Sequence, residues 1–208
     1  PYQTVVNDIN AAQLALKENL KERSKTLLNE GKTVAVLGGE HSTPLGLIEA
    51  LDDLGKPFGI LQIDAHADLR VAYEDFTQSH ASIMYNVVNN CKNLQKLVQV
   101  GIRDVAHSEV QLISTSDKIE THFDWEIKRR QFEGETWKSI VDGIIKSLPE
   151  RVYISFDIDG LHPSLCPNTG TPVVGGFELD QINYLLFQLV EAGKQIIGFD
   201  LNEVAPGT

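Results

Sequence analysis

The 208-residue chain has few cysteines, no long apolar stretch and little positive charge. Its two cysteines, Cys91 and Cys166, lie far apart without metal-type spacing, so we expect free thiols in a cytoplasmic protein. No apolar run approaches the roughly 18 residues of a membrane span, and the first residues do not resemble a signal peptide. Lysine and arginine number 18 against 29 aspartates and glutamates, a formal net charge of −11. This balance argues against a nucleic acid or an anionic membrane surface as partner.

The composition, with 42% hydrophobic and 23% charged residues, is ordinary for a globular domain. A chain of this length supports one substantial core, so we expect a single domain over 1–208. The chain begins at Pro1 without a methionine and ends directly after NEVAPGT. We therefore expect either a trimmed domain or a fragment that lacks N- and C-terminal parts of a longer polypeptide.

Apolar runs of strand length alternate with segments of helical periodicity. We expect strands at 33–37, 58–63, 97–101, 152–156 and 195–199, and helices at 8–30, 43–54, 80–89, 106–113, 137–148 and 179–192. This alternation predicts an α/β fold with right-handed βαβ units and a parallel sheet covered by helices on both faces. In such sheets, ligands bind beyond the carboxyl ends of the strands.

Side chains that can bind metals follow three of these strands. The strand FGILQI is followed by DAHAD at 64–68, and VYISF is followed by DID at 157–159. Because side chains alternate along an extended chain, the polar residues of each motif point the same way. Paired glycines at 38–39 allow a sharp turn that presents the histidine two residues later. The candidate metal ligands are therefore His41, Asp64, His66, Asp68, Asp157 and Asp159.

Four aspartates at close range repel one another, and without cations some of them would have to bind protons. Two divalent ions supply four positive charges against the four carboxylates, and the two histidines complete the set as neutral ligands. Oxygen and nitrogen donors without thiolate suit manganese, with other first-row ions possible. Two ions roughly 3.5–4 Å apart can lower the pKa of a shared water from about 15.7 to about 7. Hydroxide formed in this way can attack an unreactive carbon.

Each motif alone also has ordinary explanations. A D-x-D pair occurs at helix caps and turns, and FDIDG is similar to the nucleophile loop of haloacid-dehalogenase-like phosphatases. That family carries its loop at the first strand, whereas this motif comes late in the chain. D-x-H also occurs in metallophosphoesterases, but the G-N-H-[DE] motif that accompanies it there is missing. The combination of three motifs, each at a strand end, favours a binuclear metal site.

Taken together, the motifs resemble those of the ureohydrolase superfamily of arginases, agmatinases and formiminoglutamases. The matching segments are GGEHS at 38–42, DAHAD at 64–68, SFDIDGLHP at 155–163, TGTPVVGG at 169–176 and NEVAP at 202–206. The resemblance implies an arginase-like three-layer α/β/α sandwich with a central, mainly parallel sheet. It also implies two Mn²⁺ ions and hydrolysis of a guanidino compound to urea and an amine.

The resemblance also assigns roles to individual residues. Asp64 and Asp157 would bridge the two ions, and Asp64 is therefore counted among the catalytic residues. Glu203 would orient the substrate guanidinium, and His80 would bind substrate and donate a proton to the leaving amine. By position, one ion would be held by His41, Asp64, Asp68 and Asp157, and the other by His66, Asp64, Asp157 and Asp159.

The sequence departs from the family pattern at several positions. Glu40 replaces the usual aspartate of GGDHS, a conservative change beside the candidate ligands. His162 stands where the family usually has aspartate, and would either rearrange the loop or add a ligand. Arginases follow DAHTD with an asparagine that binds the amino-acid carboxylate, but here Leu69 and Arg70 follow Asp68.

The segment DAHADLR is most similar to agmatinases, which implies cleavage of agmatine to putrescine in polyamine biosynthesis. Formiminoglutamate or another guanidino acid is the alternative substrate, because Arg70 could bind a substrate carboxylate. Arg70 could equally form a structural salt bridge or a subunit contact. A metal-binding homologue with a structural or regulatory role is the alternative of another class. The resemblance further implies a small cationic guanidino partner and a homo-oligomer, either a trimer or a hexamer.

Overall fold

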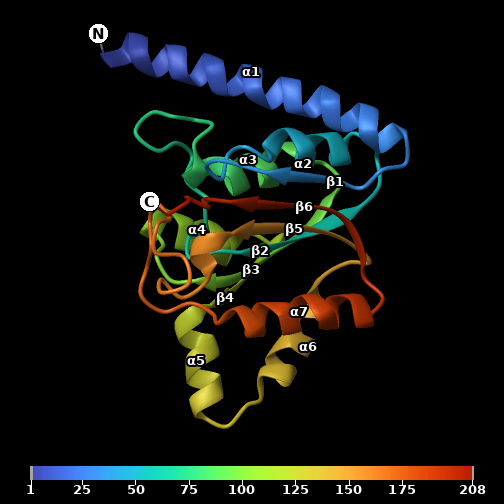
Figure 1. The fold of residues 1–208 in the computed structure, drawn as a ribbon, viewed down its shortest axis with the longest axis vertical. Coiled ribbons are helices and arrows are strands. Elements are labelled where there is room, and N and C mark those ends of the chain that lie inside the picture. Colours follow the sequence, from blue (N-terminus) through green and yellow to red (C-terminus); the bar gives the residue numbers. More distant parts are fainter. Residues whose placement is uncertain (1, 208) are drawn as a thin grey trace.

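The computed structural model describes residues 2–207, and a six-stranded sheet forms its centre (Figure 1). The strands are β1 (Val34–Leu37), β2 (Phe58–Ile63), β3 (Leu94–Ile102), β4 (Ile119–Phe123), β5 (Arg151–Asp157) and β6 (Gln195–Asn202). Their order across the sheet is β1-β6-β5-β2-β3-β4, and every neighbouring pair is parallel. The predicted parallel sheet is confirmed.

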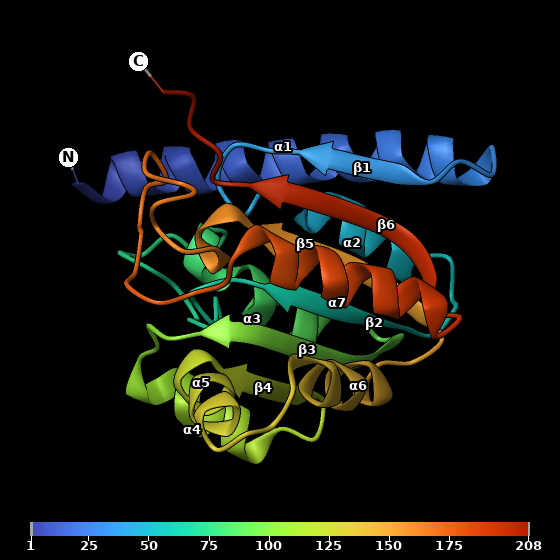
Figure 2. The same cartoon turned by 60° about the horizontal axis from the view of Figure 1, so that its bottom comes forward.

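Helices cover both faces of this sheet. They are α1 (Tyr2–Asn29), α2 (Leu45–Asp52), α3 (Ile83–Asn90), α4 (His107–Thr115), α5 (Asp124–Phe132), α6 (Trp137–Ser147) and α7 (Leu179–Glu191), with short 3₁₀ turns η1 (His80–Ser82) and η2 (Ile158–Gly160). The helices α2, α3 and α4 pack on one face, and α5, α6 and α7 pack on the other (Figure 2). This is the predicted three-layer α/β/α arrangement.

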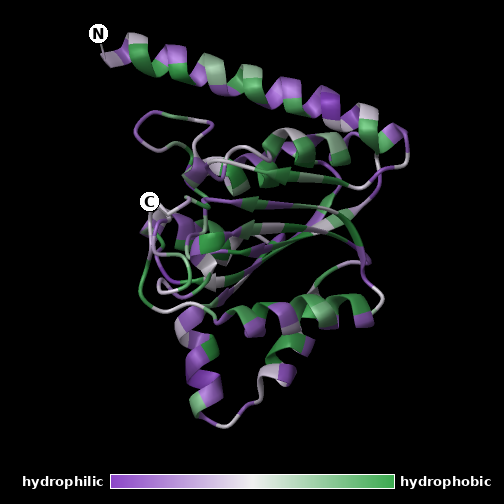
Figure 3. Ribbon diagram, viewed as in Figure 1, coloured by the Kyte–Doolittle hydropathy of each residue, from purple (hydrophilic) through white to green (hydrophobic). Residues whose placement is uncertain are grey.

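Strand side chains alternate between two hydrophobic clusters, one on each face of the sheet. In β2, Phe58 and Ile60 belong to the cluster under α2 and α3, whereas Leu61 and Ile63 belong to the cluster under α6 and α7. All six residues of β2 are buried. Figure 3 shows the apolar character of the central strands. Burial on both faces explains why β2 has no polar–apolar alternation and carries only one polar side chain, Gln62.

Helix α1 lies across the outside of α2 (Figure 1). Gly46 permits this close approach, because a Cβ there would lie 2.4 Å from the carbonyl oxygen of Lys17. Lys17 and Lys21 form ion pairs with the Glu49 carboxylate at 3.2 and 3.3 Å. Although α1 is long, none of the helices within residues 2–207 combines the length and apolar character needed to cross a membrane.

All the predicted strands and helices are present, but some of them begin or end at other residues than predicted. Helix α1 begins at Tyr2, earlier than the predicted start at position 8, and the segment predicted as a helix at 80–89 divides into η1 and α3. Strand β4 and helix α5 were not predicted. The first and last residues of the predicted 1–208 domain lie outside the described residues.

The direction of the connections along the sheet reverses between β2 and β5. The chain passes from β2 through α3 to β3 on one side, and from β5 through α7 to β6 on the other. Because the two crossovers lead in opposite directions, the carboxyl ends of β2 and β5 are not covered by a connection. Ligands of open α/β sheets bind at such a switch point.

Candidate metal centre

Three loops at the carboxyl edge of the sheet bring the candidate ligands together. The DAHAD motif follows β2, the DID motif begins at the last residue of β5, and His41 follows β1. Strands β2 and β5 are neighbours, and their register pairs Ile63 with Phe156, which places Asp64 beside Asp157. His41 reaches the same place from the edge strand. Residues separated by more than 100 positions therefore share one crevice.

His41 lies at the centre of the first group of candidate ligands. Its Nδ1 is 3.0 Å from a carboxylate oxygen of Asp64, 2.9 Å from Asp68 and 3.4 Å from Asp157. The side chain is buried, and Nδ1 makes no hydrogen bond. A buried ring nitrogen that faces three carboxylates without a hydrogen bond is the arrangement expected where a cation binds. The atoms of His41, Asp64 and Asp157 are close enough to share one ion.

His66 forms a second group with Asp64 and Asp159. Its Nδ1 lies 3.2 Å from Asp159 Oδ2 and 3.6 Å from Asp64 Oδ1. Asp64 therefore belongs to both groups, as predicted for a bridging ligand. Asp157 lies only in the first group, and its Oδ1 accepts a hydrogen bond from the Asp159 backbone at 3.0 Å. The predicted bridging role of Asp157 stays a prediction.

The close approach of these buried groups shifts their pKa values away from the usual ranges. Burial lowers the pKa of His66, but Asp159 and Asp64 outweigh this effect and raise it to about 11. Burial and the charge of Asp64 raise the pKa of Asp68 to about 7, and they raise that of Asp157 well above its usual range. Divalent cations would displace the protons that such groups bind.

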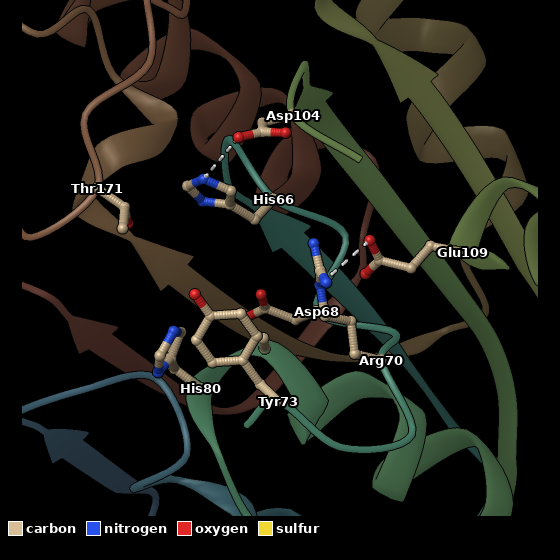
Figure 4. A pocket seen from close by; sticks show the side chains of 9 residues that line it. His66, Asp68, Arg70, Tyr73, His80, Asp104, Glu109 and Thr171 are labelled. Atoms are coloured by element: carbon tan, nitrogen blue, oxygen red, sulfur yellow. Dashed lines mark ion pairs between the residues drawn. The ribbon is translucent and has the colours of Figure 1, made fainter. Parts of the chain in front are cut away.

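A cavity of about 140 Å³ opens beside the candidate ligands (Figure 4). His66 and Asp68 form its inner wall, and Tyr73, His80 and Arg70 form the side toward solvent. The predicted proton donor His80 therefore shares a cavity with the candidate metal centre. Its imidazole packs edge-on to the ring of Tyr73, with centroids 5.6 Å apart.

Arg70 lines this cavity but is already paired. Its Nε lies 3.9 Å from Glu109 Oε2, and its guanidinium stacks over Tyr73 at 5.4 Å (Figure 4). Glu109 is buried and also accepts hydrogen bonds from the backbone of Leu69 and Ala106 at 2.9 and 2.8 Å. The salt bridge considered as an alternative for Arg70 is therefore present.

Glu203 lies on the other side of His41, at the end of β6. Its Oε1 accepts a hydrogen bond from the His41 backbone at 3.0 Å, and its own backbone donates to Gly39 at 2.9 Å. Its φ of +60° is unusual for a residue with a side chain. Burial raises the pKa of Glu203. The structure thus brings the NEVAP motif to the candidate metal centre, beside a neighbouring cavity of about 230 Å³.

The family model named Arginase family matches residues 3–208. The chain belongs to the arginase family. It is 35% identical to an N(1)-aminopropylagmatine ureohydrolase of Thermus thermophilus over 90% of this chain and 60% of that protein. It is 31% identical to an agmatinase of Chromobacterium violaceum over 93% of this chain and 56% of that protein. A solved structure of a hypothetical agmatinase from Burkholderia thailandensis matches with a TM-score of 0.77 and 28% identity, covering 93% of this chain and 57% of that one.

This member of the arginase family thus spans about 60% or less of the length of these relatives. The matched part nevertheless contains all the motifs described above. The arginase-like fold predicted from the sequence is confirmed by the structural match.

Residues that the sequence analysis did not single out support the candidate ligands from behind. The Oγ of Ser155 lies 2.8 Å from His41 Nε2, and Ser155 donates to Asp200 Oδ1 at 3.2 Å. Gln62 donates to Asp64 Oδ2 at 2.8 Å. All of these side chains are buried, and such contacts fix the orientation of a ligand. The sequence feature that could have identified these supporting residues is a polar residue inside an apolar strand, such as Gln62 or Asp200.

Arg103 ties the loop after β5 to the rest of the site. Its guanidinium donates to the backbone carbonyls of Gly101, Asp159, Leu161 and Val173 at 2.7–3.2 Å. Burial lowers the pKa of Arg103. The four carbonyls belong to β3, the SFDIDGLHP segment and the TGTPVVGG loop, so one side chain fixes their relative positions.

His162 has a local role in this loop. Its Nδ1 lies 2.8 Å from Ser164 Oγ and accepts a hydrogen bond from the Ser164 backbone at 3.2 Å. The side chain is exposed, and His162 belongs to neither group of candidate ligands among the described residues. It stabilises the turn rather than adding a ligand.

Proposed function

We propose that this chain carries the binuclear-metal centre of a ureohydrolase that cleaves agmatine to putrescine and urea with two Mn²⁺ ions. The observation that carries the proposal is the buried Nδ1 of His41, which lies within 3.4 Å of three carboxylates and makes no hydrogen bond. His41, Asp64, Asp68 and Asp157 would hold one ion, and Asp64, His66 and Asp159 the other. Oxygen and nitrogen donors without thiolate favour manganese.

When bound, a pair of divalent ions would supply an activated water as the nucleophile at neutral pH. Glu203 would bind the planar guanidinium through paired hydrogen bonds and direct its carbon toward that water. In the net reaction, one water is consumed: its oxygen ends in urea, the carbon–nitrogen bond to the amine breaks, one of its protons ends on the departing nitrogen and the other passes to solvent. His80 gives a proton to the departing nitrogen, so that a neutral amine leaves.

The charges around the cavity support a cationic substrate. Asp68, Asp104 and Glu109 line it, and the one arginine there, Arg70, is paired with Glu109. Agmatine has a positive charge at each end, whereas formiminoglutamate would need a free cation for its carboxylates. Arg70 is the observation that keeps formiminoglutamate as a second candidate, because its side chain is still 42% exposed. The name of the 35% identical relative adds N(1)-aminopropylagmatine, which is also a cation.

The first experiment is a substrate comparison. The purified, Mn²⁺-loaded protein is incubated with agmatine, N(1)-aminopropylagmatine, arginine, guanidinobutyrate and formiminoglutamate, and urea or formamide is measured. We expect urea from agmatine and none from arginine. Activity on another guanidino compound alone would overturn the substrate but keep the reaction. If the metal-loaded protein releases neither urea nor formamide from any of these substrates, the proposed activity is wrong.

A single substitution separates an enzyme from an inert metal-binding homologue. We expect Asp157→Ala to weaken metal binding by more than about 100-fold and to abolish urea release, because it removes a buried ligand. Metal content after dialysis and urea release are measured together. The matched control is Asp142→Ala, which removes an exposed aspartate of α6. An inert scaffold would lose only stability in the first variant.

The proposal extends to the setting of the enzyme. We propose a cytoplasmic homo-oligomer, a trimer or a hexamer, that contributes to polyamine biosynthesis. The free cysteines Cys91 and Cys166, which are both buried, are compatible with a reducing compartment.

A further inference from the structure

Glu40 lies in the turn after β1, where the ureohydrolase pattern usually has aspartate. Its two carboxylate oxygens face different partners. Oε1 accepts a hydrogen bond from the hydroxyl of Ser42, and Oε2 lies 3.6 Å from Nδ1 of His80. The Ser42 contact fixes the carboxylate in the direction of the imidazole. Glu40 therefore connects the turn that carries His41 to the start of η1.

The extra methylene of glutamate makes this contact possible. An aspartate at the same position would be shorter by one carbon–carbon bond of about 1.5 Å, which would leave its carboxylate about 5 Å from the imidazole. That distance is beyond the roughly 4 Å of an ion pair. The contact is thus a consequence of the residue that distinguishes this chain from the usual pattern.

The two ring nitrogens of a histidine have different tasks when one of them faces a carboxylate. Nδ1–H directed at Glu40 leaves Nε2 as the nitrogen available to the substrate cavity. The edge-on contact with Tyr73 limits rotation of the ring from the other side. Figure 4 shows both aromatic side chains at the wall of the cavity.

We propose that Glu40 is a positioning residue for His80: it holds the Nδ1–H side of the imidazole so that Nε2 faces the substrate. This role rests on the proposed function of the site. Glu40 itself does not touch the reacting atoms.

Other charges surround the imidazole, but they act from further away. Asp68 and Glu203 are the other carboxylates that act on His80, and Arg70 lines the same cavity with the opposite charge. Within the described residues, Glu40 is the carboxylate at ion-pair distance from the ring. The contact with the Glu40 carboxylate is the largest cause that raises the pKa of His80.

The direction of the pH effect follows from this arrangement. His80 donates a proton, so its imidazolium form is the active one, and kcat falls as the pH rises through the pKa of His80. Removing the negative charge of Glu40 lowers that pKa. The alkaline limb of the pH profile must then move to lower pH.

The test compares Glu40→Gln and Glu40→Asp with the wild-type protein, with metal content checked in each. In Glu40→Gln, we expect the alkaline limb of kcat to shift down by about one pH unit, with little change in KM. In Glu40→Asp, the negative charge is kept but lies further from the imidazole, so we expect a smaller shift of the alkaline limb than in Glu40→Gln. The control Glu74→Gln removes a carboxylate that lines a neighbouring cavity with Glu40 and has no ion pair with His80. We expect this control to leave the alkaline limb of kcat at the same pH as in the wild-type protein.

A second readout does not depend on turnover. The rate at which diethyl pyrocarbonate labels His80 is measured against pH by peptide mass spectrometry, because only the unprotonated ring reacts. We expect the midpoint to fall in Glu40→Gln and to stay unchanged in Glu74→Gln. An unchanged midpoint in Glu40→Gln, or a loss of kcat at every pH without a shift, would overturn the positioning role. A protein that releases no urea but shows the midpoint shift would overturn the proposed function and leave the Glu40–His80 pairing supported.

Discussion

The backbone of Gly176 has a conformation that only glycine adopts without strain. Its φ is +87°, and a Cβ there would lie 2.7 Å from the carbonyl oxygen of Leu161 and 2.9 Å from Nη2 of Arg103. The neighbours of this position are a backbone carbonyl and a guanidinium that is already hydrogen-bonded. Neither can move away easily to make room for a Cβ. The glycines at the end of TGTPVVGG therefore let the loop pass close to the strand ends that carry the candidate ligands.

We expect Gly176→Ala to lower the free energy of unfolding by about 2 kcal/mol, because it adds backbone strain and a steric clash. The matched control is Gly143→Ala in α6, where a Cβ meets nothing within 4 Å. This control should raise the free energy of unfolding by about 0.5–1 kcal/mol, because alanine is the better helix former. Urea denaturation measures both. Equal effects at the two positions would contradict the argument.

At the scale of elements, the first half of α1 supports the loop that carries Tyr73. The side chain of Asn10 donates to the Asp75 carbonyl at 3.1 Å and accepts from the Thr77 backbone at 3.1 Å. The hydroxyl of Tyr2 donates to the Glu74 carbonyl at 3.2 Å. Helix α1 thus covers α2 with one part and holds the rim of the candidate substrate cavity with another.

We expect Asn10→Ala to loosen this loop without unfolding the protein. The free energy of unfolding should fall by less than about 1 kcal/mol, because both hydrogen bonds are exposed and alanine favours the helix. Amide hydrogen exchange in 71–79 should accelerate, and kcat should fall several-fold, because His80 follows this loop. Hydrogen-exchange mass spectrometry and the urea assay measure the two effects. Asn7→Ala, which removes only a contact with Gln3, is the control.

Most of the elements that the sequence predicted have buried, regular patterns. Strand β2 and helix α6 were found because their apolar residues meet the core on every strand position or at helical spacing. Strand β4 is a short edge strand in which only Ile119 is fully buried, and α5 is mostly polar (Figure 3). In β4 and α5 the few buried side chains leave little periodicity in the sequence, whereas α1 and α4 were predicted from helical spacing although they also bury few side chains.

At the scale of the whole molecule, the candidate ligands could be predicted because each follows a strand end. The sheet order that brings β2 beside β5 could not be read from the sequence, since these strands are separated by two others along the chain. The contact between Glu40 and His80 could not be predicted from the sequence either, because it depends on the path of the loop before η1. Local motifs thus identified the chemistry, and the topology determined which motifs meet.

The net charge of −11 belongs to the molecule as a whole and should act on the substrate before binding. A negative surface with carboxylates at the cavity attracts a cation over a distance set by salt, about 30 Å at 0.01 M and about 10 Å at 0.1 M. We expect kcat/KM for agmatine to fall several-fold between roughly 10 and 200 mM NaCl while kcat changes little, because screening acts on association rather than on the bound complex. Steady-state kinetics at constant pH and metal concentration measure this. For an anionic substrate such as formiminoglutamate, the same increase in salt should raise kcat/KM. If kcat/KM for the preferred substrate rises with salt, that substrate is an anion and the proposed cationic substrate is wrong.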